Sequence, residues 1–138
     1  EVIDLFEILL YYPALRVRLK SGYYFKEPIP AFQLHGTKGS FIKTRSDRQE
    51  VDLDKGHVPM GENWGVDAVS EYGLLHVDEG SPERVPSEKG NYMAFYENVY
   101  QTLRSGATPA VPGEDGIASM RVIDAAYESL EKQAVISY

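Results

Sequence analysis

Apolar and polar residues alternate along the first part of the chain, and this alternation predicts β-strands. Leu15, Val17 and Leu19 alternate with basic residues, which is the pattern of a strand with one buried face. Residues 3–12 precede this strand and are expected to form a hairpin with it. The aromatic residues 23–25 are expected to continue the sheet.

Further short strands are expected as far as residue 85. Residues 32–35 and 40–43 flank a glycine-containing link and predict a second hairpin. Single strands are expected at 49–53, 72–77 and 83–85. The segment between the first two of these carries several glycines and a proline around Trp64, and it predicts an irregular excursion: residues 54–70.

The second part of the chain changes to a helical period. One apolar stripe predicts an amphipathic helix, with Asn91 or Ser87 as its N-cap and Gly106 just after its end. The residues of this stripe are Tyr92, Phe95, Tyr96, Val99 and Leu103. A second helix is expected to begin near Glu114, and residues 135–136 are expected to form a last short strand. The stripe of the second helix consists of Ile117, Met120, Ile123, Tyr127 and Leu130.

Strands followed by helices predict an α+β fold, a mostly antiparallel open-faced sheet with two C-terminal helices packed on one face. Two helices cover only one face of such a sheet. Residues 3–12 and 23–25 nevertheless carry apolar side chains on both faces, which a strand covered on one side does not require. The second face is therefore expected to be buried against another copy of the chain, as a homodimer or higher oligomer.

Composition narrows the classes of function. The 138 residues carry a net charge of −7, which disfavours nucleic acid as a partner, and they contain no cysteine, which excludes disulfides and thiolate metal sites. No apolar run is long enough for a membrane span, and no signal peptide is present, so a cytoplasmic location is expected. The sequence opens at Glu1 directly in strand-like residues, and we expect it to be excised from a longer protein.

The sequence motifs argue against a complete catalytic centre in this chain. Residues 36–40 lack the spacing of a phosphate-binding loop, and G-x-G-x-x-G is absent throughout, so no nicotinamide cofactor is expected to bind here. His35, His57 and His76 match no metal-ligand spacing, so no metal site is expected either. Trp64 lies between glycines and is either a substrate or subunit contact or a local anchor of its loop.

Several motifs, in order, resemble one known family. They are Asp4-x-Phe6-Glu7-Ile8-x-Leu10-x-Tyr12-Pro13 with Val17-x-Leu19-x-Ser21-Gly22, the turn Leu34-His35-Gly36-Thr37-Lys38-Gly39-Ser40-Phe41, Gly90-Asn91-Tyr92-x-x-Phe95-Tyr96 with Val99-Tyr100-x-x-Leu103-x-x-Gly106, and Pro109-x-x-x-x-Glu114-Asp115-Gly116. Together they resemble the C-terminal domain of the glucose–fructose oxidoreductase, inositol dehydrogenase and rhizopine catabolism (Gfo/Idh/MocA) family. Residues 50–88 match the general family least and look closest to its scyllo-inositol dehydrogenase-like branch.

The resemblance implies a two-domain enzyme that moves a hydride between NAD or NADP and a sugar, inositol or related polyol. Its N-terminal Rossmann domain binds the cofactor and supplies a lysine from a Glu-Lys-Pro motif, and an aspartate and a histidine lie on a helix before the sheet. None of these residues is found here, so residues 1–138 are interpreted as a single C-terminal domain without the Rossmann domain. Alone, the chain is expected to have no catalytic residue, cofactor or activity.

In this family the sheet lines part of the substrate pocket and forms the subunit interface. Lys26 and Glu27, at the break made by Pro28 and Pro30, are therefore candidates for the substrate side, together with Trp64. The alternative is an independent carbohydrate- or protein-binding sheet module without catalysis, and an unrelated hydrolase is a weaker third interpretation. An upstream G-x-G-x-x-G segment in the parent reading frame would favour the oxidoreductase.

Overall fold

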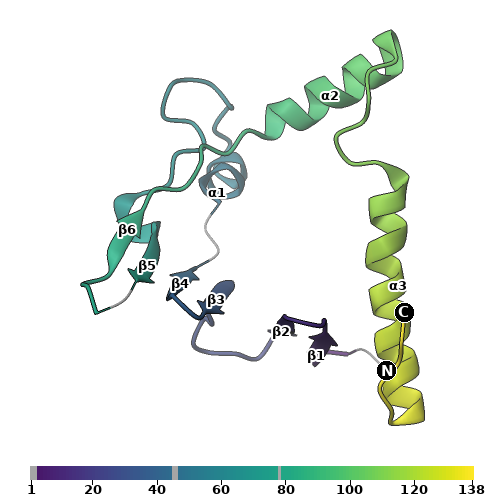
Figure 1. Ribbon diagram of the computed structural model, residues 1–138. Coiled ribbons are helices and arrows are strands. Elements are labelled where there is room, and N and C mark those ends of the chain that lie inside the picture. The colour runs from purple at the N-terminus through teal and green to yellow at the C-terminus, as the bar shows by residue number, and fades with distance from the viewer. Residues whose placement is uncertain (1–2, 45–46, 78) are drawn as a thin grey trace. The chain divides into compact units, whose positions relative to one another are not determined.

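The structure is a computed structural model that describes residues 3–44, 47–77 and 79–138. The chain divides into two compact units (Figure 1). The first unit consists of the residues up to Pro28 together with Ala110–Tyr138, and the second consists of Ile29–Pro109. Each unit is described below by itself.

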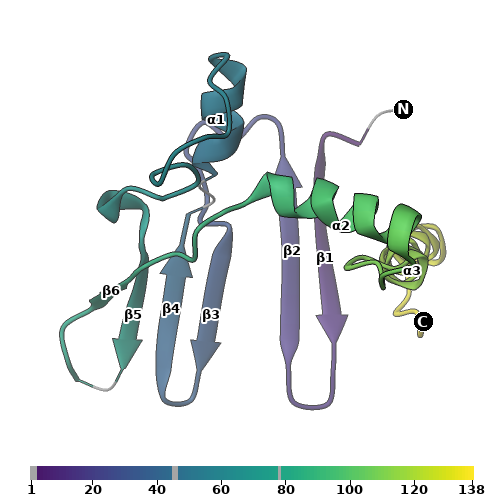
Figure 2. The same cartoon turned by 90° about the horizontal axis from the view of Figure 1, so that it is seen from above.

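The first unit contains a β-hairpin and a long helix. Strands β1 (Leu5–Tyr11) and β2 (Arg16–Gly22) are antiparallel, with Leu10 opposite Val17 and Glu7 opposite Lys20 (Figure 2). Because side chains on a strand alternate between faces, one face of this hairpin is apolar except for Ser21, which lies opposite Phe6. That face carries Phe6, Ile8, Leu10, Val17 and Leu19. The other face carries the basic residues of β2 and the ion pair between Arg18 Nε and Glu7 Oε1 at 2.8 Å.

Helix α3 (Gly113–Lys132) begins after Pro112 and ends at Gln133, which adopts a left-handed conformation with φ of 53°. Glu114 and Asp115 lie in its first turn and Lys132 in its last, so charged side chains complement both ends of the helix dipole. Beyond the helix, the Tyr138 hydroxyl lies 3.0 Å from the Tyr12 hydroxyl and connects the C-terminal residues to the hairpin.

The second unit contains a four-stranded antiparallel sheet in the order β3-β4-β5-β6 (Figure 2). Its strands are β3 (Phe32–Gly36), β4 (Gly39–Lys43), β5 (Gly73–Val77) and β6 (Glu83–Val85). Helix α1 (Arg48–Asp54) and the 3₁₀ turn η1 (Val69–Glu71) lie between β4 and β5 in sequence, and helix α2 (Tyr92–Ser105) follows β6. Of the two N-caps that the sequence offers, Asn91 caps α2 and Ser87 does not, and Gly106 ends the helix in the left-handed conformation, as predicted.

The register of this sheet places most of its large apolar side chains on one face. Directly opposite residues share a face, so Leu34, Phe41 and Leu75 project together, whereas His35, Ser40 and His76 project to the other side. We call the first side the apolar sheet face. Its apolar side chains are Phe32, Leu34, Phe41, Leu75, Val77 and Val85. Two charged residues share this face, Lys43 opposite Phe32 and Glu83 opposite Leu75. Gly73 fits this face because Phe41 covers it: a Cβ atom there would lie 2.2 Å from the phenyl ring.

The α+β class and the antiparallel pairing are confirmed, as are both hairpins and both C-terminal helices. The strand predicted at 49–53 is wrong, since these residues belong to α1. The Asp47 side chain accepts the Gln49 amide at 3.0 Å and so starts a helix there. Packing of both helices on one sheet face stays a prediction, because α2 and α3 belong to different units.

Two other predicted strand segments are also wrong. Tyr23 and Tyr24 form a turn: the ladder ends at Gly22, and one further bond from the Tyr23 amide to the Asp4 carbonyl precedes the turn. Residues 135–136 are not in a strand, since the chain leaves α3 through the left-handed Gln133 and pairs with no strand among the described residues. No helix in the described ranges has the length and apolar character to span a bilayer.

Burial is unusual for a chain of this length. Among the described residues no apolar side chain is fully buried, and the only fully buried side chain is that of Gln49, which is 2% exposed. The stripes of both long helices are exposed, with Leu103 at 78% and Tyr127 at 56%. Soluble monomers rarely leave so much apolar surface in contact with water, so these faces have the character of surfaces that are covered in an assembled protein.

Candidate functional site

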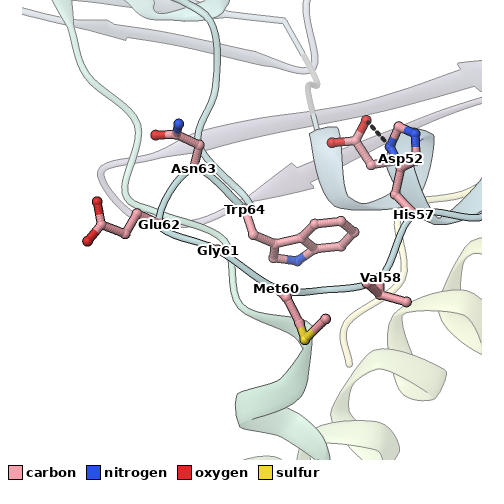
Figure 3. Close-up of a pocket in the computed structure, with 8 residues that line it drawn as sticks. All are labelled: Asp52, His57, Val58, Met60, Gly61, Glu62, Asn63 and Trp64. Carbon is pink, nitrogen blue, oxygen red and sulfur yellow. Dashed lines mark ion pairs between the residues drawn. The ribbon is translucent and has the colours of Figure 1, made fainter.

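A hollow of about 410 Å³ lies beside the loop that follows α1 (Figure 3). The indole of Trp64 extends across the hollow toward His57, whereas the side chains of Glu62 and Asn63 point away from the ring. The residues that line the hollow are Asp52, His57, Val58, Met60, Gly61, Glu62, Asn63 and Trp64. All of them come from the end of α1 or the loop after it, so the hollow belongs to the second unit alone.

Trp64 is held in place by the buried side chain of Gln49. The indole Nε1 of Trp64 donates to Gln49 Oε1 at 3.2 Å, and the backbone amide of Tyr92 donates to the same oxygen at 2.9 Å. One carbonyl oxygen on α1 thus bonds to the loop and to the start of α2. Trp64 lies 15 residues after Gln49 in sequence, and Tyr92 lies 43 residues after it. Because both donors would be left without a partner if this oxygen were removed, the contact fixes the indole relative to both helices.

Asp47 forms the other half of this connection. Its Oδ1 accepts the Gln49 amide at 3.0 Å and lies 3.4 Å from Gln49 Nε2, and its Oδ2 accepts a short hydrogen bond from the Tyr92 hydroxyl. Burial alone would raise the pKa of Asp47, but the hydrogen bonds from Tyr92 and Gln49 outweigh burial and lower that pKa. The same bond, with a smaller contribution from burial and from nearby charge, raises the pKa of Tyr92 to about 12.

Two glycines allow the loop to approach α2 closely. The Gly90 amide donates to the Gly65 carbonyl at 2.9 Å, and Lys89 Nζ donates to the Glu62 carbonyl at 2.9 Å. A Cβ atom on Gly65 would lie 2.2 Å from the Gly90 oxygen, and one on Gly90 would lie 2.4 Å from Gln49 Nε2. Gly65 also has a φ of +72°, which side chains disfavour. Glycine is therefore required at both positions for the loop to reach Gln49.

The rim of the hollow combines charged and apolar groups. His57 Nδ1 lies 3.6 Å from Asp52 Oδ1, and the His57 amide donates to the Asp52 carbonyl at 3.0 Å. The imidazole is 62% exposed and the carboxylate 20% exposed, while Val58 and Met60 are exposed beside them. An indole face flanked by a carboxylate and an imidazole suits a small molecule that presents both C–H surface and hydroxyl groups.

A second hollow, of about 360 Å³, lies at the turn between β3 and β4. His35 Nδ1 lies 3.0 Å from Ser40 Oγ, and His76 is the partner of Ser40 on β5. The hairpin that the sequence predicts here is confirmed, in place of a phosphate loop. In the part of the chain that the structure describes, no three His, Asp or Glu side chains gather closely enough to hold a metal ion.

The three residues predicted for the substrate side have different surroundings. Trp64 lines the first hollow, and its indole N–H also anchors the loop, so the two interpretations offered for it are compatible. Lys26 and Glu27 are exposed in a bend of the first unit. Sequence reasoning did not point to Gln49 or Asp52, and it considered His57 only as a metal ligand. The only local signal for the first of these was Asp47, a good N-cap residue two positions earlier.

Comparison with known proteins identifies the family. Residues 1–137 match the model of the oxidoreductase family C-terminal alpha/beta domain, that of Gfo/Idh/MocA. The chain is 36% identical to scyllo-inositol 2-dehydrogenase (NADP(+)) IolW of Bacillus subtilis over 99% of its own length, and 33% identical to the uncharacterized oxidoreductase YhhX of Escherichia coli over 96%. It spans 39% of the length of each of these relatives.

Solved structures agree with this result. YvaA of Bacillus subtilis, described as an oxidoreductase, superposes with a TM-score of 0.92 at 35% identity. The superposed region covers 100% of this chain and 42% of the YvaA chain. An oxidoreductase from Bacteroides fragilis superposes with a TM-score of 0.87, also at 35% identity, over 100% of this chain and 43% of the Bacteroides chain. The resemblance that the sequence motifs indicate is therefore confirmed, and the chain belongs to the Gfo/Idh/MocA oxidoreductase family as its C-terminal α/β domain.

Proposed function

We propose that this chain is the C-terminal part of an NADP- or NAD-dependent dehydrogenase that acts on an inositol or a related polyol. The observation that carries the proposal is the 36% identity, over 99% of the chain, to a relative named as an NADP-linked scyllo-inositol 2-dehydrogenase. The matched region covers almost the whole chain, so it includes residues 50–88, the segment that contains the Trp64 hollow. We place this reaction in the cytoplasm, with the oxidised nicotinamide as the hydride acceptor.

Cofactor binding is assigned to another domain of the complete protein, because this chain has no motif for it. Its sequence contains no G-x-G-x-x-G fingerprint for a dinucleotide, so the cofactor and the groups that accept the alcohol proton would come from a preceding Rossmann domain. The chain itself would supply part of the substrate pocket and the contacts between subunits. Its exposed apolar surface supports this role, because the chain alone buries no apolar side chain among the described residues.

The test compares the complete reading frame with the 138-residue chain. We expect the complete protein to reduce NADP or NAD when scyllo-inositol is added, and myo-inositol serves as the stereochemical control. The isolated chain should show no reduction and no saturable binding of either cofactor in calorimetric titration. A complete protein that binds scyllo-inositol but neither cofactor would contradict the proposal and favour a binding module without catalysis.

We also propose that the complete protein self-associates through the apolar sheet face. Phe32, Leu34 and Val77 on this face are between 46% and 62% exposed, and Leu34 lies in one row with Phe41 and Leu75. Pairing two identical faces around a two-fold axis would bury the whole row, and two-fold pairing is the most common arrangement for soluble oligomers. The opposite face, with His35 and its row, is more polar and suits contact with substrate or solvent.

Residues of opposite parity on β3 provide a matched test of this interface. Leu34→Arg places a charge on the apolar sheet face, whereas Gln33→Arg places the same charge on the opposite face. We expect Leu34→Arg to shift the complete protein toward the monomer in sedimentation velocity and Gln33→Arg to leave the oligomer intact. A monomeric wild type, or equal effects of the two variants, would contradict the assignment.

Lys26 and Glu27 stay predictions for the substrate side. In the complete protein, Lys26→Ala is expected to lower kcat/KM for the polyol, because a lysine at the break in the sheet can reach out of the plane of the strands. Unchanged kinetics in Lys26→Ala and Glu27→Gln would remove both residues from the substrate pocket.

A further inference from the structure

We propose that the hollow beside Trp64 is the polyol-recognition subsite of this protein, with the indole as a stacking platform and Asp52 and His57 as hydroxyl ligands. This inference rests on the proposed function and specifies it, since it names the residues of the domain that would distinguish one polyol from another. It concerns binding of the substrate and assigns no proton or hydride transfer to these side chains.

The position of the indole is the first argument. Trp64 directs its N–H to the buried Gln49, at 3.2 Å, and its ring extends across the hollow toward His57 (Figure 3). A tryptophan that served only to anchor the loop would bury its ring, but Trp64 is half-buried and its ring lines the hollow. With its N–H already bonded, what the indole offers a ligand is an apolar, electron-rich face.

The rigidity of the indole is the second argument. Gln49 also accepts the Tyr92 amide at 2.9 Å, and Gly65, next to Trp64, accepts the Gly90 amide at 2.9 Å. The loop around Trp64 is thus fastened to α1 and to the start of α2 before any ligand arrives. A platform that is already fixed loses little conformational entropy when a ligand stacks on it, which favours binding.

The polar rim is the third argument. Asp52 and His57 lie 3.6 Å apart at the edge of the hollow, and the imidazole is 62% exposed. A carboxylate accepts hydroxyl hydrogens, and an imidazole can donate to or accept from a hydroxyl, so the pair can bind two neighbouring hydroxyl groups. Asp52 is 20% exposed, and a hydroxyl bound there would be partly shielded from competing water.

The chemistry of the ligand matches this arrangement. In scyllo-inositol every hydroxyl group is equatorial, so both faces of the ring present only C–H bonds while the rim is entirely polar. One face can lie on the indole of Trp64, and the hydroxyls at the edge then point outward toward Asp52 and His57. In myo-inositol one hydroxyl is axial and interrupts one of the two faces, which gives the site a basis for distinguishing the epimers.

The experiment uses the complete protein and variants that preserve shape. Asp52→Asn keeps the size of the side chain and removes its charge, and Trp64→Leu removes the aromatic face. Asp54→Asn is the matched control, because it makes the same charge change two residues later in α1, where the exposed side chain does not line the hollow. We expect Asp52→Asn to raise KM for scyllo-inositol about tenfold and Trp64→Leu to raise it about fivefold, with KM for NADP unchanged. Asp54→Asn should match the wild type in both constants.

A fluorescence measurement covers the case in which Trp64→Leu fails to fold. The difference between the emission of wild type and Trp64→Phe isolates Trp64, and addition of scyllo-inositol without cofactor should change that difference spectrum. Asp52→Asn should weaken the change.

Two failures remain distinguishable. If the wild type oxidises no polyol with either cofactor, the proposed function is wrong. If the wild type oxidises scyllo-inositol while Asp52→Asn and Trp64→Leu keep its KM, only the subsite is wrong. The subsite is also wrong if the difference spectrum does not respond to scyllo-inositol in a wild type that oxidises it.

Discussion

Gln49 offers the most direct test of how the loop and the two helices are joined. Gln49→Met keeps the length of the side chain and removes the oxygen that accepts both the Trp64 indole and the Tyr92 amide. A buried donor left without an acceptor costs about 1–3 kcal/mol. Because the Tyr92 amide lies at the start of α2, where water can replace part of the bond, we expect about 2 kcal/mol in total.

The assay is hydrogen exchange of the Tyr92 amide in the complete protein, since local exchange reports the opening of this contact without requiring two-state unfolding of the whole. About 2 kcal/mol corresponds to a loss of protection of about 30-fold. Gln101→Met is the control, because the Gln101 side chain lies on the same helix, donates to Glu97 at 2.7 Å and accepts from Ser105 at 3.1 Å, and both partners are on that helix. This control should leave the Tyr92 amide protected.

A double-mutant cycle then isolates the bond between Gln49 and Trp64. Trp64→Phe removes the indole N–H, so the effect of Gln49→Met in that background should be smaller by about 1 kcal/mol. The two hydrogen bonds to Gln49 would be refuted if the effects of the two substitutions added to within about 0.3 kcal/mol, or if Gln49→Met left the exchange protection of the Tyr92 amide unchanged.

Two further predictions concern the same region. The hydrogen bond to the Asp47 carboxylate raises the pKa of Tyr92 to about 12. The contact therefore stabilises the fold fully below the ordinary tyrosine pKa of about 10, and this stabilisation is lost as the pH rises from about 10 to about 12. In a tyrosinate absorbance titration, Tyr92→Phe should lose the step near pH 12, and an unchanged titration would contradict the contact. Gly65→Ala should lower the melting temperature more than Gly61→Ala in differential scanning fluorimetry. Both glycines have a positive φ, but only a Cβ atom at Gly65 would clash, at 2.2 Å from the Gly90 oxygen. Equal shifts in melting temperature would show that the loop does not approach α2 as closely as described.

The sequence predicts most of the secondary structure because two strong signals agree along the chain. Alternation marks β2 and β3, and apolar runs mark β1 and β4. Pro13 places the turn of the first hairpin, and a glycine-containing link places the turn of the second. A helical spacing of apolar residues marks α2 and α3, supported by the caps Asn91 and Gly106 on α2 and by Glu114 and Asp115 in the first turn of α3. Helix α1 was not predicted because it has only 7 residues, and because Val51 and Leu53 alternate with polar residues, which is the pattern of a strand. In so short a segment the N-cap at Asp47 is more informative than the period.

The candidate site was only partly predictable, for a different reason. Trp64 stood out through its residue type and its glycine neighbours, but Gln49 did not, because a glutamine in a single sequence is expected at the surface. Its burial depends on donors 15 and 43 residues away, and on two glycines that allow the backbones to meet. Such a convergence is a property of the tertiary structure, and no local pattern in the sequence specifies it.

The apolar pattern of the chain predicts which surfaces are covered but does not identify what covers them. The stripes of α2 and α3 and both faces of β1 carry the residues of a protein interior, yet Leu103, Tyr127 and Leu5 are at least 56% exposed in this chain. The relatives are more than twice as long as the matched segment, which is 39% of their length. The proposed Rossmann domain and second subunit would supply two separate covering surfaces. Leu34→Arg tests a subunit contact on the apolar sheet face, and the cofactor assay tests for the Rossmann domain, so each part of the explanation can fail without the other.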